Sequence, residues 1–78
     1  MLIKANIGSI TDPKKNEIID NKVTLQNVIE DYHFDTTNGV VTIDGTPVNK
    51  NEFDKTLEEL GVVEGSYVTF SIKNGGNR

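Results

Sequence analysis

The fold is decided by the stretch Thr24-Leu25-Gln26-Asn27-Val28-Ile29-Glu30-Asp31-Tyr32, which has the pattern of one amphipathic helix. Its apolar residues fall at i, i+3, i+4 and i+7 and form a single stripe: Leu25, Val28, Ile29 and Tyr32. Thr24 is a suitable N-cap, because its hydroxyl can accept from an amide two or three residues further on. We expect the helix to end near His33, since residues 35–39 favour a loop.

The segments around this helix have the patterns of strands. Met1 to Ile7 alternates with a period of two, which indicates a half-buried strand. Further strands are predicted at 17–20, 40–43, 46–48 and 67–72. Asp44-Gly45 is a strong hairpin signal, because both residue types tolerate positive φ, and Pro47 restricts the return strand to an edge.

The segment before the last strand predicts a second, shorter helix. Asn49 or Asn51 could cap a helical segment over residues 52–60, and Gly61 is well placed to end it. Glu64-Gly65 then favours a turn.

These elements predict an α+β fold, with a small mixed sheet packed on one main helix. The length of 78 residues is enough for one hydrophobic core only. We therefore expect one domain over residues 1–74 and a flexible C-terminal tail over residues 75–78.

The tail carries the most specific functional signal. The last strand leads through Lys73-Asn74 into Gly75-Gly76, and only Asn77-Arg78 follows. Glycine has no Cβ, so two in succession can enter a channel that other residues would block. Two glycines are also common at a frayed chain end, because chain termini are poorly tied down.

Composition excludes several classes of function. A net charge of −4 argues against nucleic acid as a partner, because such binders normally carry a basic stripe. The apolar runs are too short to span a membrane, and no secretory signal pattern is found. The absence of cysteine excludes disulfides and suits a cytoplasmic protein.

Taken together, these residues resemble the ubiquitin-like β-grasp family, which includes ubiquitin and the sulfur carriers of thiamine and molybdopterin synthesis. Residues 56–62 resemble the Thr-Leu segment of ubiquitin, and residues 41–48 resemble a strand, turn and return of the sulfur carriers. Residues 64–66 resemble the turn of the carriers before their closing strand. The order of these motifs, with Gly75-Gly76 in register, spans most of the chain.

The resemblance implies a protein modifier or sulfur carrier. In these families an activating enzyme adenylates the carboxylate of the second glycine. The acyl adenylate is then converted to a thiocarboxylate or passed as a thioester to a lysine. The implied activation site is Gly75 and Gly76, and the implied recognition tail is Ile72, Lys73 and Asn74. Mature family members end in Gly-Gly, so a peptidase would first have to remove Asn77 and Arg78.

Besides the two residues after Gly76, the chain differs from ubiquitin at the positions of ubiquitin's exposed apolar patch. The outward positions here are expected to be Thr42, Thr69 and Ser71, which makes recognition by ordinary ubiquitin receptors doubtful. The alternative function is a non-covalent ubiquitin-like interaction module that binds a protein through its sheet face or an edge strand.

An enzyme is not expected, because no credible pair of nucleophile and base is found. His33 between Asp31 and Asp35 has too few donors for a metal site, and Glu58-Glu59 is interpreted as solvated charge. We expect no catalytic residues, no metal and no cofactor, and a monomer whose partner is an activating enzyme or another protein.

Overall fold

The structure, a computed structural model, describes residues 1–9 and 15–72. For Lys15 and Ile72 it describes the backbone only. The elements in these residues are β1 (Leu2–Ser9), β2 (Lys15–Asp20), α1 (Leu25–Asp31), β3 (Gly39–Ile43), β4 (Thr46–Pro47), the 3-10 helix η1 (Lys50–Glu52) and β5 (Tyr67–Ile72).

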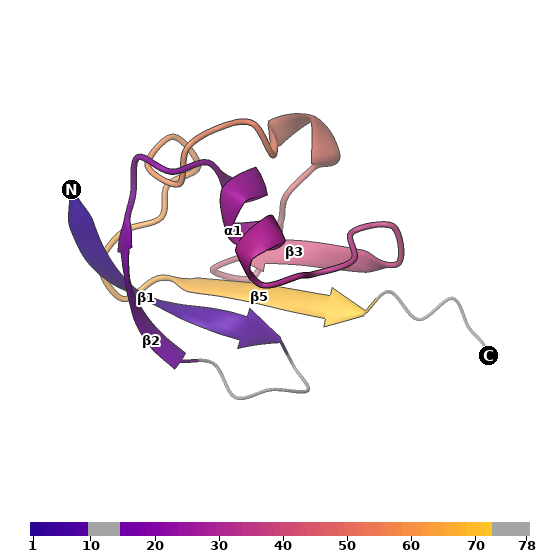
Figure 1. The fold of residues 1–78 in the computed structure, drawn as a ribbon, viewed down its shortest axis with the longest axis horizontal. Coiled ribbons are helices and arrows are strands. Elements are labelled where there is room, and N and C mark those ends of the chain that lie inside the picture. Colours follow the sequence, from indigo (N-terminus) through magenta and orange to yellow (C-terminus); the bar gives the residue numbers. More distant parts are fainter. Residues whose placement is uncertain (10–14, 73–78) are drawn as a thin grey trace.

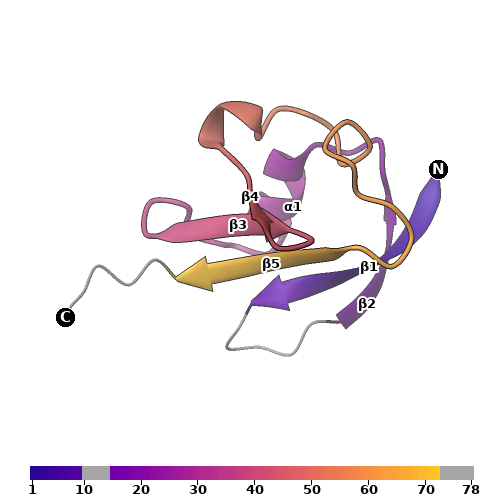
Figure 2. The same cartoon turned by 180° about the vertical axis from the view of Figure 1, so that it is seen from behind.

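The strands form one mixed sheet in the order β2-β1-β5-β3-β4. Strand β1 pairs with β5 in parallel, and the other three pairs are antiparallel. Helix α1 lies across one face of this sheet, as Figures 1 and 2 show from opposite sides. The α+β class expected from the sequence is confirmed, including the small mixed sheet packed on one main helix.

The core lies between the sheet and α1. Its buried residues come from the inward positions of β1, β3 and β5, from the helix stripe and from the segment that follows η1: Ile3, Ala5, Ile7, Leu25, Val28, Ile29, Val41, Ile43, Phe53, Leu57, Val62, Val68 and Phe70. The period-two pattern of the strands is therefore confirmed as the pattern of burial. Strand β1 continues two residues beyond the predicted Ile7, and β2 begins two residues before the predicted Glu17.

The helix begins as the sequence predicts. The Thr24 hydroxyl accepts from the Asn27 amide at 3.2 Å, which is the expected N-cap bond. Two further amides of the first turn, those of Leu25 and Gln26, donate to the carbonyls of Lys55 and Phe53 at 3.0 and 2.9 Å. The segment 53–55 thus satisfies amides that have no partner within the helix.

The short helix predicted over residues 52–60 is wrong. Only Lys50–Glu52 is helical, as one 3-10 turn, and turns follow to Gly61. The reason is tertiary: the Leu57 and Glu58 amides donate to Val23 and Asn21 carbonyls, both at 2.9 Å, instead of closing helical turns. Gly61, predicted to follow that helix, has φ +87°, so the left-handed conformation expected there is found although the helix is not.

The hairpin between β3 and β4 is confirmed. Asp44 and Gly45 have φ values of 51° and 87°, as a tight two-residue hairpin turn requires. The Asp44 carboxylate also bonds the start of β5: Oδ1 accepts from the Tyr67 amide at 2.9 Å, and Oδ2 from the Ser66 hydroxyl at 3.0 Å. The turn is therefore fixed against the central strand.

Candidate functional site

The C-terminal end of β5 is held by strands on both sides. Ile72 pairs with Gly39 and Ser71 with Val40 across the β3 ladder, while Phe70 pairs with Ser9 of β1. Strand β5 therefore leads out of the middle of the sheet rather than from an edge. Of the predicted tail residues, only the backbone of Ile72 is described; Lys73, Asn74, Gly75, Gly76, Asn77 and Arg78 lie outside the described residues.

An aromatic cluster packs beneath this end of β5. Phe34 stacks on Phe70 with ring centroids 4.8 Å apart, and the Tyr32 ring lies 5.7 Å from that of Phe70. Gly39 leaves the space that Phe34 occupies, because a Cβ at Gly39 would lie 2.3 Å from Cζ of that ring. These contacts fix the end of β5 to the end of α1. The sequence analysis placed Tyr32 on the apolar stripe of the helix but missed Phe34 and Gly39.

Tyr32 is the C-cap residue of α1 and keeps 37% of its surface exposed. Partial burial of the phenol, followed by the nearby negative charge of Glu17, raises its pKa to about 12 from 10.0. The neutral phenol is thus the form that the fold favours.

The raised Tyr32 pKa predicts a loss of stability in alkali. Stability from this group is complete below the unfolded value near pH 10 and falls as the pH rises towards 12. Urea unfolding across this window should therefore show a shallower alkaline decline for Tyr32→Phe than for the wild type. Tyr67→Phe removes a phenol hydroxyl from an exposed ring and is the control for loss of a tyrosine hydroxyl as such. Equal slopes for Tyr32→Phe and wild type would contradict the assignment.

The outer face of the sheet, away from α1, is polar near the end of β5. Thr42 pairs with Thr69, and Ser71 lies next along β5; all three are half-buried and alternate with buried core residues. These are the outward positions predicted from the sequence. This half of the face therefore presents hydroxyl groups and no exposed apolar patch at these three positions, as the sequence predicted.

The other half of the outer face carries three exposed apolar side chains among polar ones, which the sequence analysis missed. We name as the apolar face Leu2, Ile18 and Tyr67, whose exposed fractions are 69%, 68% and 52%. Lys4 lies directly opposite Ile18, and Asn6 opposite Tyr67, so the three apolar residues share the outer side of adjacent strands. The sequence did contain a signal for the exposure of Leu2, because Leu2 alternates with the inward Ile3 and must therefore lie on the opposite face of the sheet.

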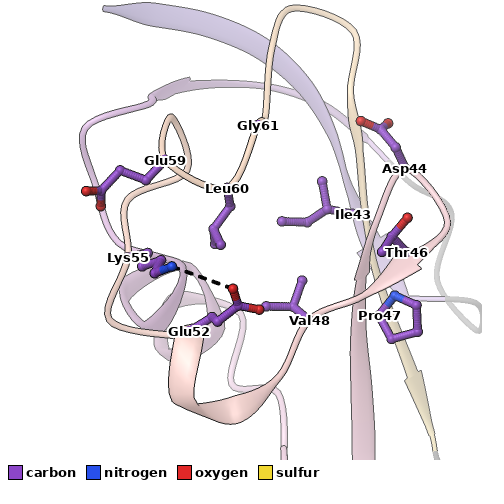
Figure 3. Close-up of a pocket in the computed structure, with 10 residues that line it drawn as sticks. All are labelled: Ile43, Asp44, Thr46, Pro47, Val48, Glu52, Lys55, Glu59, Leu60 and Gly61. Carbon is purple, nitrogen blue, oxygen red and sulfur yellow. Dashed lines mark ion pairs between the residues drawn. The ribbon is translucent and has the colours of Figure 1, made fainter.

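A hollow of about 350 Å³ opens between the β3–β4 hairpin and residues 52–61. Figure 3 shows the side chains of Ile43, Val48 and Leu60 pointing into it from three different segments. The Glu52 carboxylate and the Lys55 ammonium lie 3.6 Å apart at its rim. The residues meet only in the folded chain, so no local sequence pattern could have predicted the hollow.

Other charged groups singled out in the sequence have structural partners. Glu58 pairs with Lys22 at 2.6 Å. Glu59 accepts from the Thr56 amide and hydroxyl, and this bonding, chiefly that of the amide, lowers its pKa. Among residues 1–9 and 15–72, no group of three or more acidic, histidine or cysteine side chains could hold a metal. Within the same residues no helix is long and apolar enough to cross a membrane.

Comparison with known proteins identifies the fold. No model of a protein family and no curated protein matches the chain. Among solved structures, a ubiquitin-like domain of an Arabidopsis thaliana protein aligns with TM-score 0.72 and 12% identity, covering 99% of this chain and 83% of that one. The C-terminal ubiquitin-like domain of mouse tubulin-specific chaperone e gives 0.69 and 11%, covering 99% and 92%. The ubiquitin of Caldiarchaeum subterraneum gives 0.67 and 17%, covering 99% and 100%.

These similarities, together with the mixed sheet and single main helix, confirm the ubiquitin-like β-grasp fold expected from the sequence. At such identities they establish the fold and no specific activity.

Proposed function

We propose that this ubiquitin-like protein is a modifier or sulfur carrier, activated at the carboxylate of Gly76 after removal of Asn77 and Arg78. The observation that carries the proposal is the sequence Gly75-Gly76 shortly after a β5 strand that leaves the centre of a ubiquitin-like sheet. In this role the protein is the substrate of an activating enzyme and not itself an enzyme. We place it in the cytoplasm and assign it no cofactor.

The proposed chemistry needs a tail that is long enough to reach the active site of the activating enzyme and narrow enough to enter it. Adenylation requires the carboxylate to meet the α-phosphate of ATP inside the activating enzyme, while the folded body stays outside. Residues 73–76 follow the last described residue of β5, and four extended residues span at most about 14 Å. Glycine at the last two positions keeps the segment free of side chains where the enzyme closes round it. Ile72, Lys73 and Asn74 form the part that the enzyme would recognise.

The proposal predicts the mass and the activation of the tail. Protein purified from its native host should end at Gly76 or carry sulfur there. A chain of residues 1–76 should support exchange of pyrophosphate with ATP by the activating enzyme of the host, and the 1–78 chain should not. Gly75→Val within 1–76 should lower this exchange by about a hundredfold, because it misplaces the reacting carboxylate. Glu30→Gln within 1–76, on the exposed side of α1 and outside the tail, is the control, and its exchange should stay close to that of the 1–76 chain.

An intact 1–78 mass in the native host, combined with no exchange by the 1–76 chain, would refute the carrier proposal. That outcome would favour the second candidate.

The second candidate is a non-covalent protein-interaction module, and the apolar face favours it. Leu2, Ile18 and Tyr67 keep more than half of their surface in contact with solvent on one side of the sheet. Exposed apolar side chains on one face, with polar residues such as Lys4 and Asn6 among them, can form part of a protein-binding site. The face lies around the start of β5, whereas activation takes place beyond its end, so the two roles use separate parts of the molecule.

This candidate predicts that the apolar face governs binding. In the native host, proteins that co-purify with the tagged chain should be lost from the triple variant Leu2→Ser, Ile18→Ser and Tyr67→Ser. The change should leave the fold intact, because these side chains are exposed rather than part of the core. Thr42→Ala with Thr69→Ala changes the polar half of the same face and is the control. Unchanged co-purification with the triple variant would exclude the apolar face as the binding site.

A further inference from the structure

Strand β2 is a free edge of the sheet. In the part of the chain that the structure describes, β2 pairs on one side only, with β1, and in Figure 1 it forms one margin of the sheet. The opposite edge strand, β4, is two residues long and contains Pro47, whose nitrogen has no hydrogen to donate. Strand β2 has six residues and no proline, so it is the edge that can accept another strand.

The backbone groups that face out from β2 follow from the bonds of β1. The Asn6 amide donates to the Ser66 carbonyl at 2.8 Å, on the β5 side of β1. Because the backbone groups of successive residues in a strand point to opposite sides, those of Ala5 face its pair residue, Glu17 of β2. The N–H and C=O groups of the next residue, Ile18, therefore point away from β1, as do those of the residues two positions before and after it. Outward groups of this kind bind another extended backbone.

A hollow leaves room for a strand beside β2. It measures about 450 Å³ and is formed by β2 and the C-terminal end of α1, with the lining residues Glu17, Ile18, Ile19, Asp31 and Tyr32. On the outer face of the sheet, Ile18 keeps 68% of its surface exposed. An added strand would therefore find space on the inner side and an apolar side chain on the outer side.

The sequence of β2 is complementary to itself in one register. Two copies related by a two-fold axis pair their edge strands in antiparallel, and only centres at Glu17 and Ile18 pair most of the six-residue strand. The first centre sets Glu17 directly opposite its own copy, and like charges in that position are destabilising. The second sets Ile18 opposite its own copy and Asn16 opposite Asp20. Glu17 then faces Ile19, so no two like charges lie opposite each other.

The pairing of Asn16 with Asp20 allows a hydrogen bond between side chains. Both residues lie on the outer face with Ile18, because side chains two positions apart in a strand share a face. Within one chain, Oδ1 of Asp20 accepts from the N-terminal ammonium group and from the Lys22 amide, both at 3.0 Å. These bonds hold the carboxylate in place and leave Oδ2 to accept from the Asn16 side-chain amide of the second copy. The two-fold axis makes this contact twice.

From these features we propose that two copies of this chain form an antiparallel dimer through β2, with the two-fold axis at Ile18. The Ile18 amide and carbonyl of each copy bond those of the other, and the two five-stranded sheets become one. Paired edge strands bury little surface, so the dimer is weak, with a dissociation constant on the order of 1 mM. The monomer expected from the sequence is then the form at low concentration. The pairing goes beyond the proposed function, because it involves neither the tail nor a covalent step.

The test is two-dimensional NMR of the full 78-residue chain over a range of concentrations. Moderate salt is present, because each copy carries a net charge of −4 that salt screens. Amide shifts at residues 16, 18 and 20 should follow one saturable dependence on concentration. In a mixture of labelled and unlabelled chain, Hα of Glu17 should contact Hα of Ile19 in the other copy, because such non-hydrogen-bonded pairs bring the Cα atoms within about 4.5 Å.

Two substitutions at Asn16 test the register through charge. Asn16→Lys sets an ammonium group opposite Asp20 and should tighten the dimer by about fivefold, because the contact is made twice. Asn16→Asp sets two carboxylates opposite each other and should weaken the dimer by a similar factor. The same two changes at Asn51, which is exposed in η1 beyond the opposite edge strand, are the matched controls. They should change the dissociation constant by less than about twofold, because salt screens charges far from the contact.

Ile18→Pro tests the backbone bonds. The Ile18 N–H points away from β1, so its loss leaves the β1–β2 ladder intact but removes the central hydrogen bonds of the dimer. Dimerisation should fall below detection, while the amide spectrum at low concentration remains that of the folded chain. Ile18→Thr keeps both the N–H and a β-branched side chain, and it should still form the dimer, though more weakly.

Two results would overturn the proposal. One is the absence of concentration-dependent shifts at residues 16, 18 and 20 in both the wild type and Asn16→Lys, well above the expected dissociation constant, which would leave this edge to a strand of another protein. The other is equal dissociation constants for Asn16→Lys and Asn16→Asp, which would place the contact elsewhere. Neither result bears on activation at Gly76, so failure here and failure of the carrier proposal can be told apart.

Discussion

The parallel pairing of β1 with β5 is the constraint on which the rest of the structure depends. Parallel neighbours cannot be joined by a tight turn, so the chain between them must cross over the sheet. Helix α1 lies in that connection and covers the inner face. The pairing also puts β5 between β1 and β3, so that the strand leading towards the diglycine is the most enclosed one. The tail that we propose as the site of activation thus follows a strand with neighbours on both sides.

The same constraint separates the functions that the molecule could perform. Because the helix covers the inner face, side chains on the outer face stay accessible. Hydroxyls lie near Ser71, and the exposed Leu2 and Ile18 lie among polar residues on the other half. The hollow lies apart from both, where the β3–β4 hairpin meets the long connection to β5. The Asp44 carboxylate links these regions physically, since it fixes the hairpin turn to the first residue of β5. The outer face, the hollow and the end of β5 are thus separate surfaces of the molecule.

The features that could be predicted from the sequence are those set by local spacing of apolar residues and by backbone preference. The helix, its Thr24 cap, the alternating strands and the Asp44-Gly45 turn all follow from spacing and backbone preference within a few residues. The sequence prediction failed over residues 52–60, where amides that would close helical turns bond residues 21 and 23 instead. Long-range contacts also explain why the packing of Phe34 into the space at Gly39 and the meeting of Val48 with Leu60 in the hollow were missed. The tail residues were predicted from composition and resemblance alone, and their role remains a proposal.

Native-state hydrogen exchange measured residue by residue tests the central position of β5 most directly. Amides of a strand enclosed on both sides should exchange only when the whole domain unfolds. We predict that Val68, Thr69 and Phe70 give exchange free energies equal to the free energy of unfolding in urea, while amides of the edge strand β2 exchange through smaller openings. Exchange of the β5 amides at free energies below those of β2 would contradict the account.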